Sequence, residues 1–200
     1  MTTTWFDLLR HGEPDGGPRY RGHRDDRLSD LGWEQMGAAL RDDDHWDHIL
    51  TSPLARCRAF AEALAAERGL SCTVEPGFKE ISFGAWEGLT PEQVEERFGD
   101  SQARFWRDAE RHSPDGGESI QAFHERVGAA WRHWHKELAG QRVLLVCHGG
   151  VIRMILAEVL ETPLEAAFRT VAVPYANRSR IRLDDSPHGR LASLLSHGIV

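Results

Sequence analysis

Short apolar runs alternate along this chain with longer segments of helical periodicity. The apolar runs predict buried strands over residues 5–9, 48–51, 71–75 and 143–147. Periodicity and end signals predict helices over residues 30–41, 54–68, 119–138 and 149–160, with a further helix beginning at residue 90. Strands that alternate with helices are typical of a parallel sheet with helices on its faces. We therefore expect an α/β fold, a three-layer αβα sandwich around a mostly parallel central sheet.

Local signals define several element ends. Thr90-Pro91-Glu92-Gln93 has the spacing of a capping box with proline at the first helical position, and Gly69 is placed to end the helix before it. The tail over residues 179–196 predicts two strands joined at 184–187. The least regular stretch, residues 98–118, is rich in charged and aromatic side chains. It has two interpretations, a short lid-like insertion beside the sheet edge or a polar connection.

Three of the predicted strands lead into side chains that can bind an anion. Arg10 and His11 follow the first strand, and His148 follows the strand over 143–147. Arg56 lies in the first helical turn after the strand over 48–51. Ligands of open α/β sheets bind at the carboxyl ends of the strands, so we expect these four side chains to meet. Two guanidiniums, two imidazoles and nearby helix N-termini are suited to a phosphate group.

Composition narrows the classes of partner. The 200 residues carry a formal net charge of −7 and have a pI of about 5.9, which leaves no basic stripe to bind nucleic acid. No apolar run approaches the length of a membrane span, and the first residues lack the pattern of a secretory leader. The length favours a single domain over 1–200. We expect a cytoplasmic protein that contacts neither nucleic acid nor membrane.

Cysteine and histidine spacing argues against other kinds of chemistry. Cys57, Cys72 and Cys147 are odd in number and widely spaced, so they form neither a disulfide framework nor a zinc motif. Cys57 adjoins Arg56, which leaves two interpretations for it, a core residue or a reactive thiol. No group of histidine and acidic residues has the spacing of metal ligands. We therefore expect no metal ion and no cofactor.

Six sequence blocks together match a known family. The first is Arg10-His11-Gly12, and the others cover residues 22–32, 52–56, 80–88, 116–119 and 148–150. Each block is moderately specific by itself, but their order and spacing are highly specific. Over nearly its whole length the chain resembles the histidine phosphatase superfamily, also called phosphoglycerate mutase-like.

The resemblance implies a phosphohistidine mechanism, with His11 as the nucleophile and Glu80 as the acid–base residue. It also implies that Arg10, Arg56 and His148 bind the phosphoryl oxygens and that Gly149 belongs to the substrate-binding residues. The residues support this independently, because flanking cations disfavour the protonated form of an imidazole and keep it nucleophilic. Glu87 and Glu13 remain competing candidates for the acid. Arg21 and Gly22 follow the nucleophile loop, where Arg21 has two interpretations, a substrate ligand or a surface arginine.

Within the superfamily the chain is most similar to the small bacterial phosphatases, the α-ribazole phosphatases in particular. The resemblance implies a phosphomonoesterase that hydrolyses a small phosphorylated metabolite, with α-ribazole 5′-phosphate of cobalamin synthesis as one candidate. A cofactor-dependent phosphoglycerate mutase is an alternative. Mutases of this superfamily usually have an asparagine soon after the nucleophile and a longer insertion after the acid. Residues 14–17 include no asparagine and the insertion after Glu80 is short, so the mutase is disfavoured. A phospho-ligand-binding module without catalysis is a second alternative. The expected partner is a small phosphate ester, and a homodimer is left open.

Overall fold

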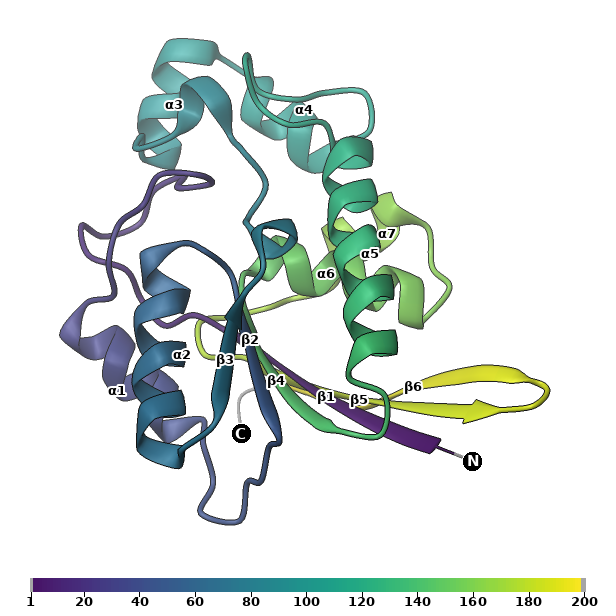
Figure 1. Cartoon of the computed structure of the whole chain (residues 1–200). Coiled ribbons are helices and arrows are strands. Elements are labelled where there is room, and N and C mark those ends of the chain that lie inside the picture. Colours follow the sequence, from purple (N-terminus) through teal and green to yellow (C-terminus); the bar gives the residue numbers. More distant parts are fainter. Residues whose placement is uncertain (1, 199–200) are drawn as a thin grey trace.

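One six-stranded sheet runs through the molecule, which the computed structural model describes over residues 2–198 (Figure 1). Its strands are β1 (Thr2–Arg10), β2 (His48–Thr51), β3 (Ser71–Val74), β4 (Arg142–Cys147), β5 (Arg178–Ser186) and β6 (Gly189–Gly198). In space they follow the order β3-β2-β4-β1-β5-β6. The first four are parallel, and β5 and β6 form an antiparallel hairpin at one edge. The predicted mostly parallel sheet is confirmed.

Helices cover both faces of this sheet. One face packs against α1 (Asp30–Ala38) and α2 (Ala55–Arg68) through a core that includes Leu9 and Leu144. The other face packs against α5 (Ile120–Glu137) and α6 (Gly149–Val159) through a core that includes Phe6 and Leu145. The remaining helices are α3 (Pro91–Phe98), α4 (Ser101–Arg107), α7 (Leu164–Thr170) and the single turns η1 (Pro76–Phe78) and η2 (Gly84–Trp86). Within residues 2–198, none of the helices is both long and apolar enough to cross a membrane.

The predicted element ends agree with the structure in most places. The Thr90 capping box forms, and Gly69 ends α2 with a φ of 65°. Helix α1 ends three residues earlier than predicted, and Asp44 accepts a hydrogen bond from the Arg41 backbone N–H in the turn that follows. The hairpin turn lies beyond residue 186 rather than at 184–187, because Asp184 and Asp185 still pair with β1.

The stretch 98–118, which is the least regular in the sequence, contains α4. Helices α3 and α4 lie together at one end of the molecule, at the top of Figure 1. Phe105 of α4 is buried, and it makes an edge contact with the ring of Phe168 in α7. The segment is therefore docked on the rest of the protein in this structure. Whether it closes over a ligand remains a prediction.

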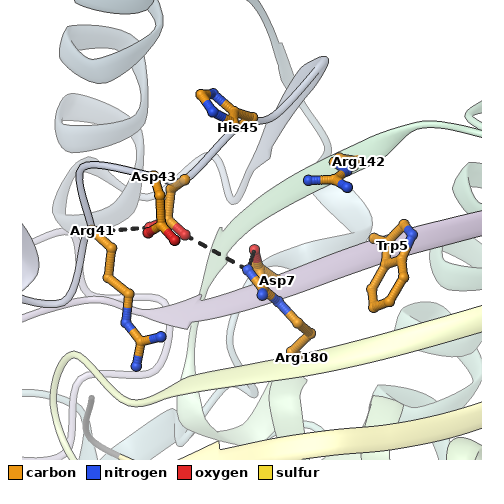
Figure 2. A pocket seen from close by; sticks show the side chains of 8 residues that line it. Trp5, Asp7, Arg41, Asp43, His45, Arg142 and Arg180 are labelled. Carbon is orange, nitrogen blue, oxygen red and sulfur yellow. Dashed lines mark hydrogen bonds and ion pairs between the residues drawn. The ribbon is translucent and has the colours of Figure 1, made fainter.

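A buried ionic network lies toward the amino ends of β1 and β4, beside a cavity of about 190 Å³ (Figure 2). Asp7 accepts hydrogen bonds from Arg178 at 2.7 Å, from Arg180 at 2.8 Å and from the Trp46 indole at 2.8 Å. Arg178 also forms two bonds of 2.6 Å to the carboxylate of Asp44. Both carboxylates are thus paired by guanidiniums. The network joins β1, β5 and the loop before β2.

The two carboxyl groups in this network have lowered pKa values. Burial raises the pKa of Asp7, but its hydrogen bonds from Arg180 and Arg178 outweigh burial and lower it overall. Burial also raises the pKa of Asp44, but hydrogen bonds from Arg178 and from the Arg41 backbone N–H outweigh burial and lower this pKa overall. A lowered folded-state pKa stabilises the fold above the unfolded-state pKa, and this stability is lost as the pH falls through the folded-state value.

We predict that Arg178→Met destabilises the protein by about 3–5 kcal/mol at neutral pH, because it removes the guanidinium that the two buried carboxylates share. The free energy of unfolding in urea measures this loss. The difference from the wild type should shrink below about pH 4, where the carboxylates of the variant become protonated. A loss below about 1 kcal/mol, or one that is the same at both pH values, would contradict this role for the network.

Candidate active site

Three neighbouring strands bring the predicted site residues together. In the sheet order β4 lies between β2 and β1, and the register pairs Arg10 with Cys147. His11 and His148, which directly follow these two residues, therefore lie side by side with ring centroids 5.2 Å apart. Arg56 reaches the same place from the first turn of α2. The expectation that strand ends would gather these four side chains is met.

The hydrogen bonds of His11 define which ring nitrogen is free. Its Nδ1 lies 2.7 Å from the carbonyl oxygen of Gly12. A carbonyl oxygen can only accept, so Nδ1 carries the proton and Nε2 keeps its lone pair. Burial first, and then Arg56 and Arg10, hold the pKa of His11 well below its usual range. The ring is therefore a neutral imidazole with an unprotonated Nε2.

Arg10 and Arg56 are held by backbone carbonyl groups. Arg56 is 1% exposed and donates to the carbonyls of Gly22 and Arg24, each at 2.8 Å. Arg10 donates to the carbonyl of Val173. The buried Nε atoms of both guanidiniums have no hydrogen-bond partner among residues 2–198. Because carbonyls carry no net charge, both cations keep their full charge at the site, which suits an anionic ligand.

His148 and Cys57 are buried beside His11, and their side chains contact each other. His148 is fully buried, and its Nε2 lies 2.6 Å from the Ser52 hydroxyl oxygen. Burial and the neighbouring Arg56 lower its pKa well below the usual range. Cys57 is 3.6 Å from the same ring, and burial raises the pKa of its thiol. A raised pKa disfavours the thiolate, so the structure supports the core interpretation of Cys57.

Glu80 faces the site from the loop after η1. Its carboxylate accepts hydrogen bonds from the backbone N–H groups of Ile81 at 3.0 Å and Gly150 at 3.1 Å. Gly150 makes this approach possible, because a Cβ there would lie 2.2 Å from the Glu80 carboxylate. Arg126 of α5 fixes the Glu80 loop by donating to the carbonyls of Gly77 at 3.0 Å and Lys79 at 2.8 Å. Sequence analysis did not identify Arg126, because its partners lie 47 and 49 residues away.

Glu87 has a different environment from Glu80. Its Oε1 accepts hydrogen bonds from the backbone N–H groups of His23 at 2.8 Å and Phe83 at 3.1 Å. These bonds tie the Glu80 loop to the loop that follows β1. Glu87 does not line the cleft that contains His11, whereas Glu80 does. The geometry favours Glu80 over Glu87 as a proton donor in that cleft.

The loop over residues 14–28 closes on itself beside His11. Its base is fastened where the backbone N–H and hydroxyl of Ser29 donate to the carbonyl of Glu13 at 2.9 and 3.0 Å. Gly12 and Gly32 meet there so closely that a Cβ on Gly12 would lie 2.1 Å from the Gly32 carbonyl oxygen. The loop therefore leaves and rejoins the protein at one point.

Arg21 and Gly22 of this loop both line the cleft. Arg21 is 6% exposed, donates to the carbonyl of Gly17 at 2.8 Å and pairs with Asp26 at 3.1 Å. Gly22 has a φ of 47°, and a Cβ there would lie 2.4 Å from the Glu87 carboxylate. Most donors of Arg21 are thus used to hold the loop, and Gly22 lets two loops pack tightly. Their part in binding substrate remains a prediction.

Aromatic side chains form the outer wall of the cleft, whose volume is about 180 Å³. Trp106 of α4 donates from its indole nitrogen to the Tyr20 hydroxyl at 2.8 Å and stacks on Phe168. Tyr175 packs over the guanidinium of Arg10 at 4.4 Å. It is followed by Ala176, whose φ of 55° is rare for a residue other than glycine. The contacts of Trp106 and Tyr175 join segments that are distant in the chain, so the sequence pattern does not predict them.

The cleft and the cavity of Figure 2 differ in the charge that they offer a ligand. Asp7 and Asp44, which line the cavity of Figure 2, are paired with Arg180 and with Arg178, which lies outside its lining. The cleft instead contains Arg10 and Arg56, whose guanidiniums are held by carbonyls, together with the neutral His11. The cleft is therefore the candidate active site. Across the part of the chain that the structure describes, no three His, Cys, Asp or Glu side chains form a group that could hold a metal ion.

Comparison with known proteins agrees with this site. The chain belongs to the histidine phosphatase superfamily (branch 1), whose family model matches residues 6–193. A bifunctional protein of Mycobacterium tuberculosis is 32% identical over 173 residues, which make up 84% of this chain and 47% of that relative. The chain thus spans about half the length of this curated relative.

Two solved structures are similar over almost the whole chain. A mycobacterial glucosyl-3-phosphoglycerate phosphatase in complex with VO3 has a TM-score of 0.85 and 25% identity, covering 98% of this chain and 99% of that one. The α-ribazole phosphatase from Shigella flexneri has a TM-score of 0.82 and 26% identity, covering 98% and 96%. The superfamily resemblance is confirmed. The finer resemblance to α-ribazole phosphatases is matched equally by the glucosyl-3-phosphoglycerate phosphatase.

We predict that the His11 imidazole stays neutral from about pH 8 down to about pH 5.5, a range in which an ordinary histidine gains a proton. The reason is its lowered pKa in the folded state. NMR titration of ring-labelled histidine measures this, with the His11 signal assigned by its absence in His11→Ala. Arg56→Met should move the titration toward higher pH, because it removes a neighbouring cation. Titration of wild-type His11 within this range would contradict the assignment.

Proposed function

We propose that this protein is a phosphomonoesterase that hydrolyses small phosphorylated metabolites through a phosphohistidine intermediate. The observation that carries the proposal is the neutral His11, with a free Nε2, beside two guanidiniums that no carboxylate neutralises. A nucleophile needs an available lone pair, and a phosphoryl group needs cations around its oxygens. Membership of the histidine phosphatase superfamily supports the same reaction.

In the first step His11 Nε2 attacks phosphorus, an N–P bond forms and the bond from phosphorus to the ester oxygen breaks. Arg10, Arg56 and His148, together with the backbone at Gly149, surround the phosphoryl oxygens and stabilise their charge. Glu80 gives its proton to the departing alkoxide, which leaves as an alcohol. In the second step Glu80 takes a proton from water, the water oxygen attacks phosphorus and inorganic phosphate leaves. The free imidazole is then restored.

The aromatic wall supports a substrate whose alcohol carries a ring, because Trp106, Phe83 and Tyr20 line the cleft. α-Ribazole 5′-phosphate is one candidate of this kind. A second is glucosyl-3-phosphoglycerate, the substrate named for a structural relative. With either candidate, the only partner that the proposed reaction needs is a small phosphate ester. No protein partner, metal or cofactor enters the proposed reaction.

We predict that a labelled phosphate ester leaves an acid-labile, base-stable phosphoryl group on the protein, as expected for phosphohistidine. The adduct should be absent from His11→Ala. His45→Ala is the matched control, because His45 lines the cavity of Figure 2 rather than the cleft, and it should keep the adduct. Acid quench followed by mass analysis measures the adduct.

An adduct that survives in His11→Ala would overturn the proposed nucleophile. Free phosphate release separates a hydrolase from the two alternatives. Efficient conversion of 3-phosphoglycerate to 2-phosphoglycerate in the presence of the bisphosphate would instead indicate a mutase. Binding of phosphate esters without turnover would indicate a module without catalysis.

We predict that Glu80→Gln slows phosphorylation by alkyl phosphates by about 10²–10⁴-fold, the usual contribution of a general acid. Aryl phosphates should lose much less, because a phenolate leaves without help. Single-turnover rates of phosphorylation measure this, since they exclude any effect of Glu80 on the second step. An equal loss for both kinds of ester would show that Glu80 is not the acid, and Glu87 and Glu13 would then be the residues to test.

A further inference from the structure

Three consecutive carbonyl groups in the segment that joins α7 to β5 each accept a hydrogen bond from a side chain of a different element. The first donor lies on α6, the second lies on β6, and the third ends β1. The three pairs are Arg153 with Val171 at 2.8 Å, His197 with Ala172 at 2.7 Å, and Arg10 with Val173. The first and third donors line the cleft, whereas the second lies outside its lining. The segment is therefore fastened both from the cleft and from outside it.

His197, the donor outside the cleft, has contacts on both ring nitrogens. It lies on β6, the edge strand of the sheet, opposite Ser179 of β5 (Figure 1). Because the Ala172 carbonyl can only accept, His197 Nε2 carries a proton, and in the neutral ring Nδ1 accepts from the Ser179 hydroxyl at 2.8 Å. Ser179 is fully buried and accepts from the side-chain amide of Asn177 at 3.2 Å. The ring of His197 is thus held in one orientation, although the residue is exposed.

The segment over residues 171–177 has a shape that its own backbone does not favour. Ala176 has a φ of 55°, in the left-handed region that a Cβ disfavours. No helix or strand includes the segment, and one turn within it is closed by the Asn177 N–H, which donates to the Pro174 carbonyl at 3.1 Å. Bonds to neighbouring elements therefore determine much of its shape.

We propose that His197 is a positioning residue, which acts through the adjacent carbonyls of Ala172 and Val173 on the guanidinium of Arg10. This proposal rests on the proposed function, to which it adds a residue that touches no substrate. Within residues 2–198, the one hydrogen bond of the Arg10 guanidinium goes to Val173. Tyr175 of the same segment packs over this guanidinium at 4.4 Å. A segment released at Ala172 lets the guanidinium shift, and a displacement of about 1 Å can slow a reaction about hundredfold.

His197→Ala should lower kcat/KM by about tenfold for alkyl and aryl phosphates alike, because Arg10 binds the phosphoryl group that all these esters share. The dissociation constant of vanadate, a mimic of the phosphoryl group, should rise by a similar factor. Steady-state kinetics and calorimetry measure the two effects. A variant that is only partly folded would instead have fewer vanadate sites of unchanged affinity. The control is His188→Ala, because His188 is an exposed histidine in the turn between β5 and β6, and it should match the wild type.

Two amide variants separate the contacts of His197. In His197→Gln the side-chain amide reaches the position of Nε2, so it can still donate to the Ala172 carbonyl. In His197→Asn the amide reaches the position of Nδ1, so it can contact only Ser179. The glutamine variant should recover a good part of kcat/KM and of vanadate affinity, and the asparagine variant should resemble His197→Ala. A glutamine variant that is no better than the asparagine variant would contradict the role of the Ala172 carbonyl.

A double-mutant cycle tests whether His197 acts through Arg10. Its variants are Arg10→Met, His197→Ala and the two combined, and kcat/KM for an aryl phosphate is measured for each. Once the guanidinium is absent its position no longer matters, so His197→Ala should cost less than about twofold in the Arg10→Met background. Losses that multiply in the double variant would show that His197 acts on another group and would overturn the proposal.

The proposal would also be overturned if kcat/KM and the vanadate dissociation constant of His197→Ala lay within about twofold of the wild type. Failure of the proposed function is a different result, because the wild-type protein would then form no adduct on His11 and release no phosphate. Vanadate binding would still report in that case whether His197 positions Arg10, since it needs no turnover.

Discussion

The site depends on how its arginines are held. In the proposed reaction Arg10 and Arg56 need to be immobile, yet a carboxylate partner would cancel the charge that a phosphoryl group requires. The protein uses backbone carbonyl groups, from Val173 for Arg10 and from Gly22 and Arg24 for Arg56. The Gly22 and Arg24 carbonyls lie in the loop that follows β1, and the Val173 carbonyl lies in the segment that precedes β5. The contrast with Arg178, which two aspartates neutralise, shows the same side chain used for stability instead of binding.

That arrangement also determines the protonation state of His11. His11 lies in a buried place beside two uncompensated cations, so adding a third positive charge to its ring is unfavourable. Sequence analysis attributed the neutral ring to like charge alone, whereas burial is the larger cause in the structure. The Gly12 carbonyl then selects the tautomer by accepting from Nδ1. Charge and hydrogen bonding together leave Nε2 as the free atom.

The sequence predicted two kinds of feature: element ends marked by nearby residues, and the contacts that follow from neighbouring parallel strands. The ends of the parallel strands follow from apolar runs, and parallel strands bring their carboxyl ends together, so the grouping of Arg10, His11, Arg56 and His148 followed. Glu80 came from the family resemblance, because nothing in its neighbourhood alone distinguishes it from Glu87. The contacts of Arg126, Trp106 and Arg153 depend on loops and helices distant in the chain. Only the folded protein brings those partners within reach.

The closed loop over 14–28 has a consequence for how such a protein diversifies. Because Glu13 and Ser29 fasten its base and Gly12 packs directly on Gly32, its length can change without moving His11. Loop-closure entropy grows slowly with length, so doubling such a loop costs only about 0.6 kcal/mol. Pro14, Arg19 and Arg21 from this loop face the cleft. Insertions and deletions that spare Gly22 and Arg24, whose carbonyls hold Arg56, can reshape the mouth of the cleft, which makes the first part of this loop a natural target for altering selectivity by design.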